Sequence, residues 1–186
     1  MIDTFGSQTK AQEIILLLND VKEVVRQGFY DSELIEVEKF CQENRLFLVK
    51  SKFKVLLDDG EDNKITNDYS NKGIRLKEDD PQGMYFVYIS KSEEKAWLAN
   101  YYELVGDDRS LGLLLGYPKC CVGYFCDNFK AEKTNLELKP TNPWTNLGKR
   151  AEDCVLLSHF PCSSDCEKSI VLGKKYFEIL QSDDEN

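Results

Sequence analysis

The residues best suited to bind a metal or to act in catalysis lie in one short segment toward the C-terminal end of the chain. The only histidine, His159, and two cysteines, Cys162 and Cys166, fall within eight residues of one another. A second pair of thiols, Cys120-Cys121, lies upstream, directly after Pro118-Lys119. Thiolate sulfur and imidazole nitrogen are the ligands that zinc and iron–sulfur centres select. A thiol beside an imidazole is also the pair that makes a nucleophilic cysteine.

A metal site is the first hypothesis that these residues support. The spacing His159-x-x-Cys162-x-x-x-Cys166 allows all three side chains to bind one ion, although it is looser than paired Cys-x-x-Cys motifs. Cys120 or Cys121 would supply the fourth ligand. Because adjacent side chains diverge, we expect one of these two thiols to bind and the other to pack or to react. Zinc is favoured, and an iron–sulfur cluster is the second option.

Two alternatives use the same residues differently. In a metal-free thiol enzyme, Cys120 or Cys162 would be the nucleophile and His159 its base. In a binding module, Tyr117, Trp144 and the loop over residues 131–147 would form the surface, and the cysteines would only hold it together through a metal. Cys126 and Cys154 stand outside both clusters, and we interpret them as ordinary core or surface thiols.

The elements that carry the two clusters can be predicted from capping and periodicity. Pro118 suits the first position of a helix, which places Cys120 and Cys121 in its first turn. Ser164-Asp165-Cys166-Glu167 matches a capping box, which places Cys166 in the first turn of the last helix. A helix N-terminus carries partial positive charge and stabilises a thiolate. We therefore expect two helix starts to converge, with a sulfur of Cys120 or Cys121 within ~4 Å of Cys162 or Cys166.

The rest of the chain is predicted to be an α+β fold in one domain over residues 1–186. A helical segment spans 1–44, a small antiparallel sheet 45–90, and a helical region with the cysteine and histidine site 91–182. Apolar spacing predicts a helix from Thr9 to Gly28, and a second helix from Asp31 or Ser32 with Ile35 and Cys41 on its apolar side. The remaining predicted elements are strands at 46–49, 53–57, 73–76 and 84–89, loops at 58–72 and 131–148, helices at 93–105 and 111–115, and a strand or helix end at 155–157.

Composition narrows the classes of partner. The net charge of −9 and the pI near 4.8 make nucleic acid an unlikely partner, because phosphate backbones repel an acidic chain. We find neither an apolar stretch of the ~20 residues that a membrane span needs nor a basic, apolar leader. Seven cysteines, an odd number, argue against a disulfide framework. We expect a cytoplasmic protein whose partner is an unknown small molecule or protein.

The motifs together resemble a known prokaryotic family. They are Gly116-Tyr117-Pro118-Lys119-Cys120-Cys121, then Asn142-Pro143-Trp144, then His159-Phe160-Pro161-Cys162-Ser163-Ser164-Asp165-Cys166. This pattern, over about residues 85–180, is similar to domain-of-unknown-function family four hundred and eighty-three. The resemblance supports the importance of these residues, and it implies no activity.

Overall fold

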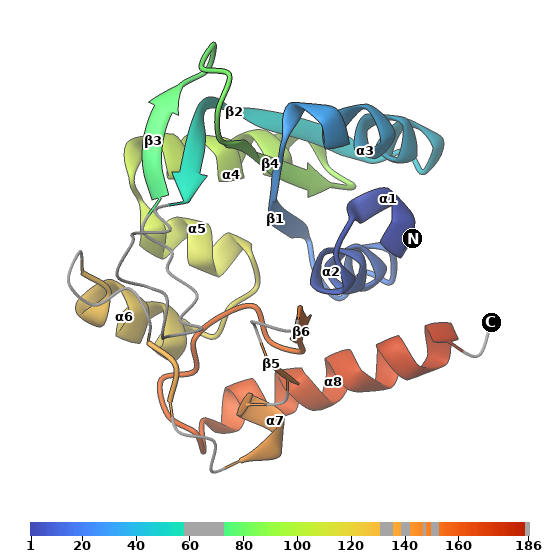
Figure 1. Ribbon diagram of the computed structural model, residues 1–186. Coiled ribbons are helices and arrows are strands. Elements are labelled where there is room, and N and C mark those ends of the chain that lie inside the picture. Colours follow the sequence, from blue (N-terminus) through green and yellow to red (C-terminus); the bar gives the residue numbers. More distant parts are fainter. Residues whose placement is uncertain (58–72, 131–135, 139–141, 147, 150–152, 185–186) are drawn as a thin grey trace.

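The computed structural model describes residues 1–57, 73–130, 136–138, 142–146, 148–149 and 153–184, and it shows the expected α+β fold (Figure 1). A four-stranded antiparallel sheet has the strand order β1-β4-β2-β3, and β5 pairs with β6 in a short separate ribbon. The strands are β1 Val24–Phe29, β2 Phe47–Leu57, β3 Gly73–Lys77, β4 Met84–Ser90, β5 Gly148–Lys149 and β6 Cys154–Val155. The helices are α1 Ile2–Phe5, α2 Gln8–Leu18, α3 Asp31–Glu43, α4 Glu93–Val105, α5 Asp108–Leu114, α6 Lys119–Asn128, α7 Pro143–Asn146 and α8 Glu167–Asp184.

Helices cover both faces of the larger sheet. Because neighbouring side chains on a strand point to opposite faces, Val25 and Ile89 pack with α1, α2 and α3, whereas Val24 and Tyr88 pack with α4 and α5. The first of these cores also contains Cys41, which confirms its predicted place inside the protein. Ile35 was placed on the wrong side of α3, since 71% of its surface is exposed. No helix in the described part of the chain has the length and apolar character that crossing a membrane requires.

The predicted helix from Thr9 to Gly28 is wrong in its second half. Helix α2 ends at Leu18, and Asp20 adopts a left-handed conformation with φ of 58° that redirects the chain. The following residues form β1, in which Val25 pairs with Ile89 of β4. A helix over these residues would have removed an edge strand from the sheet, so pairing with β4 outweighs the local helical spacing.

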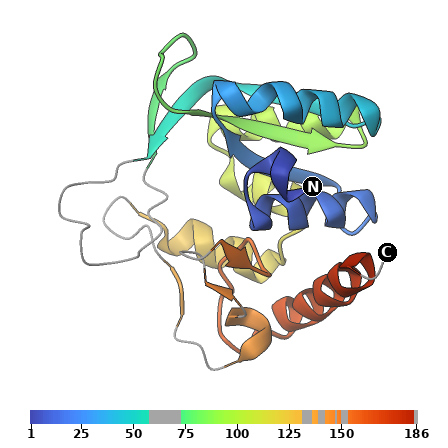
Figure 2. The same ribbon diagram turned by 45° about the vertical axis from the view of Figure 1, so that its right-hand side comes forward.

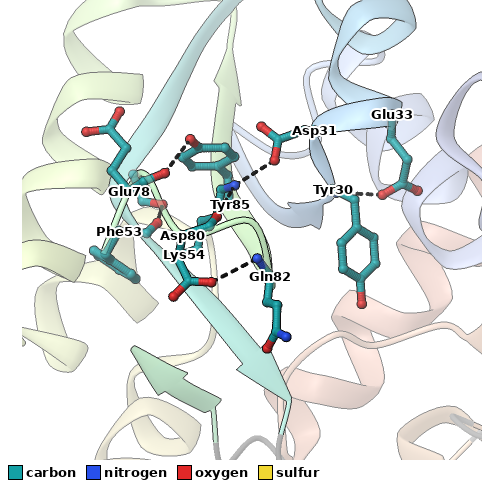
Figure 3. Close-up of polar contacts among 10 residues, drawn as sticks. Tyr30, Asp31, Glu33, Phe53, Lys54, Glu78, Asp80, Gln82 and Tyr85 are labelled. Carbon is teal, nitrogen blue, oxygen red and sulfur yellow. Dashed lines mark hydrogen bonds and ion pairs between the residues drawn. The ribbon is translucent and has the colours of Figure 1, made fainter. Parts of the chain in front are cut away.

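The two strands predicted at 46–49 and 53–57 are one strand, β2, with an irregularity between Lys50 and Lys54 where the pairing with β4 shifts register. The irregularity buries the side chain of Lys54. Its Nζ lies 2.6 Å from Oδ2 of Asp31 and 2.7 Å from the carbonyl oxygen of Asp80 (Figure 3). The contact joins the first residue of α3 to the sheet. The loop predicted at 58–72 lies outside the described residues.

The other boundaries differ from prediction by small amounts. Pro118 caps α6 and does not occupy its first turn, and α8 begins at Glu167, so Cys166 precedes that helix. Helix α7 lies within the stretch 131–148 that was predicted to be a loop throughout. The apolar run at 155–157 begins as strand β6.

Side chains from the far end of the sequence hold the N-terminal helices. The carboxylate of Asp153 accepts hydrogen bonds from Ser7 Oγ at 2.7 Å and from the backbone N–H of Gln8 at 2.6 Å, so it caps α2 together with Ser7. The buried ammonium of Lys22 lies 2.7 Å from Oε1 of Glu13 and 3.2 Å from Oγ of Ser158. Helices α2 and α8 contact each other, and they lie side by side in Figures 1 and 2. These contacts fix the segment that leads into the cysteine site.

Candidate metal centre

Four cysteine sulfurs from two distant parts of the chain meet at one point. The Sγ atoms of Cys120, Cys121, Cys162 and Cys166 all lie within 4.8 Å of one another. Cys166 Sγ is 3.7 Å from the sulfurs of both Cys120 and Cys121, and these two are 3.9 Å apart. The predicted approach of the two thiol clusters to within ~4 Å is therefore confirmed. The structure also brings both members of the adjacent pair to the site, where the sequence indicated only one.

These separations fit a single tetrahedral ion. With Zn–S bonds of ~2.3 Å, tetrahedral geometry places neighbouring sulfurs ~3.8 Å apart. The 3.7 Å and 3.9 Å contacts match that value. The donor set of four thiols also fits, because tetrahedral sulfur coordination is typical of zinc and of iron. A cysteine cluster that could hold a metal ion is thus present.

Local backbone structure explains how adjacent cysteines can share a site. Gly116, with φ of 81°, ends the turn after α5, and Pro118 then caps α6. The pair Cys120-Cys121 follows in the first turn of α6, where the side chains diverge less than on a strand. Cys166 directly precedes α8 and is fixed to it, because its carbonyl oxygen accepts the first hydrogen bond of that helix, from the N–H of Ile170 at 2.9 Å.

The four thiols differ in their surroundings. Cys121 and Cys166 are buried, Cys162 is half-buried and Cys120 is exposed. The backbone N–H of Cys162 donates a hydrogen bond to Cys121 Sγ at 3.4 Å. Backbone donors of this kind stabilise negative charge on sulfur. The site therefore has a buried side with hydrogen-bond donors and one thiol at the surface.

The protonation of the thiols follows from this environment. Burial raises the pKa of Cys121 well above the usual thiol range, and burial together with the neighbouring Cys166 raises the pKa of Cys162 to about 11. Burial acts on Cys166 in the same direction, but hydrogen bonds from the side chain and backbone of Ser169 outweigh it and lower the pKa of Cys166 to about 7. Without a metal, Cys166 is therefore the first of these three thiols to ionise. A bound cation replaces the protons on all of its thiol ligands.

His159 lies beside the cluster, with a serine between them. Its Nε2 is 2.9 Å from Oγ of Ser169, which lies 3.3 Å from Cys121 Sγ. The imidazole is buried and packs on Tyr117, with ring centroids 5.2 Å apart.

Sequence reasoning missed Ser169, although a signal for it exists. Ser169 lies three residues after Cys166 and one turn into α8, and residues spaced in this way share a helix face. The hydroxyl of Ser169 is therefore expected on the same side of the helix as the thiol of Cys166. Ser169 is fully buried, so its hydroxyl must find partners inside the protein, and it finds them in His159 and Cys121.

Of the two aromatic residues proposed for a binding surface, Tyr117 packs on His159 beside the cluster, whereas Trp144 lies against α8. Trp144 packs edge-on against Phe177 of α8 at 5.7 Å between ring centroids, and Lys174 lies over its ring. Residues 131–135, 139–141 and 147 of the proposed loop are outside the described part of the chain, as is the side chain of Cys154. Cys126 is half-buried on α6 and is not a member of the four-thiol group.

Comparison with known proteins gives one match. A family model described as "Protein of unknown function (DUF483)" matches residues 98–184. This segment contains all four clustered cysteines as well as His159 and Ser169. No curated protein and no solved structure matches the chain.

Proposed function

We propose that this chain, whose residues 98–184 belong to the DUF483 family, binds one zinc ion through Cys120, Cys121, Cys162 and Cys166. The observation that carries the proposal is the mutual approach of four sulfurs to within 4.8 Å. Four thiols this close repel one another once they ionise, and a cation at their centre turns that repulsion into attraction. Zinc suits the position because it prefers a tetrahedral set of thiolates and imposes no redox chemistry.

An iron–sulfur cluster is supported less well by the same distances. Such a cluster places several iron and sulfide atoms between its cysteine ligands, so those thiolates must stand farther apart than ligands of one ion. The 3.7 Å contacts of Cys166 with Cys120 and Cys121 leave room for one ion only. A single iron ion on four thiolates has the same geometry as zinc, and its strong colour distinguishes it.

The proposed role of the ion is structural. Catalytic zinc sites have three protein ligands and keep a fourth position for water, whereas structural sites are closed by four. Four thiols close this site, and they join the start of α6 to the start of α8. Free thiols in this number fit a reducing compartment, so we place the protein in the cytoplasm.

Metal analysis of protein purified without oxygen tests the proposal. We expect one zinc per chain, and loss of zinc in Cys162→Ser and Cys166→Ser. Cys126→Ser is the matched control, because this thiol lies on α6 outside the group and should leave the zinc content unchanged. Full zinc occupancy after either substitution would contradict the assignment of that cysteine as a zinc ligand. Iron with inorganic sulfide would favour a cluster.

A metal-free thiol enzyme is the second candidate, and one observation favours it. A hydroxyl links the only histidine to a thiol, through His159, Ser169 and Cys121. The sequence predicted Cys120 or Cys162 as nucleophile with His159 as base, whereas this chain of contacts leads to Cys121. The candidate requires one cysteine that alkylates much faster than the others near neutral pH and slows in His159→Ala. Uniformly slow thiols in zinc-free protein would remove it.

A further inference from the structure

A cavity of about 150 Å³ lies between the sheet and the thiol cluster. Its wall is formed by β1, α4, α5, α6 and residues 158–160, and both Cys121 and His159 belong to it. A cavity of this size is large enough for a single aromatic ring, since engineered cavities of ~150 Å³ bind benzene. Unlike those cavities, this one has charged groups in its wall, so its charges and its apolar surface together define what it would bind.

The charged groups in the wall carry more negative than positive charge. They are the guanidinium of Arg26 and the carboxylates of Glu103 and Asp108. Glu103 engages Arg26, with Nε at 2.5 Å from Oε2, and also Arg75, whose Nη2 lies 3.6 Å from its Oε1. The guanidinium groups of both arginines are thus committed to Glu103, and the ammonium of Lys22, which contacts Ser158 of the wall, is paired with Glu13. The ion pairs among the described residues include none for Asp108.

The setting of Asp108 is unfavourable for a charged carboxylate. Partial burial raises its pKa and the negative charge of Glu103 raises it further, and these effects outweigh the opposing influence of Arg26 and Arg75. Asp108 is exposed as a residue and also lines the cavity, so its carboxylate stands where the cavity meets solvent. A cation bound beside it would remove the electrostatic cost.

The one guanidinium of the wall is already engaged. Besides its ion pair, the guanidinium of Arg26 stacks on Phe86, with its central carbon 3.7 Å from the ring centroid. An anionic ligand would have to displace Glu103 from Arg26 while facing a second carboxylate. The aromatic side chains of Tyr117, Phe125 and Phe160 complete the wall. Aromatic faces attract cations and pack well against flat apolar groups.

We infer that the cavity binds a small organic cation, a primary amine with a body the size of one ring. The amine would lie against Asp108, and the ring would lie among the aromatic side chains toward His159. This inference does not depend on the identity of the metal, because none of the charges that carry it belongs to a thiol.

The experiment compares three ligands of the same shape and different charge: benzylamine, benzyl alcohol and benzoate. Each is titrated into the full chain as purified without oxygen, and binding is followed by backbone amide chemical shifts. We expect saturable shifts at residues 111–115 and 158–160 with benzylamine, which should bind about tenfold more tightly than benzyl alcohol. Benzoate should bind more weakly than either. Equal or tighter binding of the alcohol or of benzoate would overturn the inference, as would the absence of saturable shifts with the amine.

Variants of Asp108 separate a specific site from a general affinity for amines. Asp108→Asn should weaken benzylamine about fivefold and leave benzyl alcohol unchanged. Asp108→Lys places a cation at the mouth of the cavity and should weaken benzylamine further. Asp127→Asn is the control, because this carboxylate is exposed on α6 and is not part of the cavity wall. An Asp108→Asn protein that keeps its fold and its full benzylamine affinity would refute the assignment.

Discussion

Nε2 of His159 lies 2.9 Å from the hydroxyl oxygen of Ser169. That hydroxyl oxygen in turn lies 3.3 Å from the sulfur of Cys121. The only histidine of the chain is therefore connected to the thiol cluster through a serine hydroxyl. Groups in this position fix the orientation of metal ligands and tune their basicity.

The first prediction concerns this contact. Ser169→Ala and His159→Gln should each weaken zinc affinity about 10–100-fold, the usual effect of losing a group that supports a ligand. Because they act along one path, the double variant should be no weaker than the worse single variant. Competition with a chromophoric chelator measures the affinities.

Ser182→Ala is the control for these variants, since this serine lies on the same helix, outside the thiol group, and its hydroxyl donates a hydrogen bond to the carbonyl oxygen of Ile179. A different result would favour the ligand role that the sequence predicts for His159. In that case His159→Gln would abolish binding while Ser169→Ala retained full affinity.

The second prediction concerns removal of the metal. A structural zinc site contributes its binding free energy to folding, so a strong chelator should lower the melting temperature of the zinc-loaded chain. Cys166→Ser should melt at the lower temperature with or without chelator, and Cys126→Ser should behave as the parent chain. Thermal unfolding followed by circular dichroism measures the effect. A chelator that strips the zinc without moving the melting temperature would contradict a structural role.

The third prediction concerns domain organisation. Contacts of Asp153 with Ser7 and of Lys22 with Ser158 join the two ends of the sequence, and we expect residues 1–186 to unfold as one domain. The two tryptophans report on different parts, Trp97 on α4 and Trp144 on α7. In Trp97→Phe and Trp144→Phe, the remaining fluorophore should give the same denaturation midpoint as circular dichroism in the same protein. Separate midpoints would show two folding units.

The fourth prediction concerns the cap of α2. Asp153→Asn should cost about 1–2 kcal/mol near neutral pH, because the carboxylate accepts N–H groups of the first turn. Burial opposes ionisation, but hydrogen bonds from Ser7 and Thr9 lower the pKa of Asp153 below its usual 3.8. A depressed pKa means that the stabilisation is present above 3.8 and is lost as the pH falls through the lower folded-state value.

The difference in unfolding free energy between the parent chain and Asp153→Asn should therefore be constant above about pH 5 and shrink in more acidic solution. Urea denaturation across this range measures it. Asp20→Asn is the control, because Asp20 forms an exposed ion pair with Lys91 and no helix cap. A difference that grows on acidification would contradict the assignment.

The fifth prediction concerns the buried pair of Lys22 and Glu13. Glu13→Gln leaves the ammonium of Lys22, whose side chain is 1% exposed, without its counter-charge, and should cost about 3–5 kcal/mol. The double variant Glu13→Leu with Lys22→Met should recover most of this loss, because an apolar pair needs no compensation. Chemical denaturation compares the three proteins. If Glu13→Gln is as stable as the parent chain, the pair contributes little.

Local signals were sufficient for most of the elements around the site. Ser92 and Asp107 accept hydrogen bonds from the first turns of α4 and α5, as capping chemistry predicts. Strand β1 was missed because Val24 and Val25 continue the helical spacing of Leu17 and Val21. Only pairing with β4, sixty residues later in the sequence, makes them a strand. The Asn19-Asp20 step, with its tolerance of left-handed backbone, was the available stop signal.

The approach of the two thiol clusters was predictable from the sequence, and the arrangement of the residues around them was less so. The residue types and their placement at helix starts indicated the meeting of Cys120 and Cys121 with Cys166. The arrangement around His159 depends on the rotation of α8, which follows from packing of Tyr176 and Leu157 against α2 and not from any local pattern. A spacing of residues in the sequence does not record such a rotation.

The 46 positions between Cys120 and Cys166 also set an order of events during synthesis. A ribosome adds about 5–20 residues per second, so the adjacent thiols of α6 leave it seconds before their partners exist. By then every strand of the four-stranded sheet has been made, since β4 ends at Ser90. Binding of the proposed metal ion would therefore be among the last steps in the synthesis and folding of the protein. During that interval the thiols of Cys120 and Cys121 would have to remain reduced in order to bind the ion later.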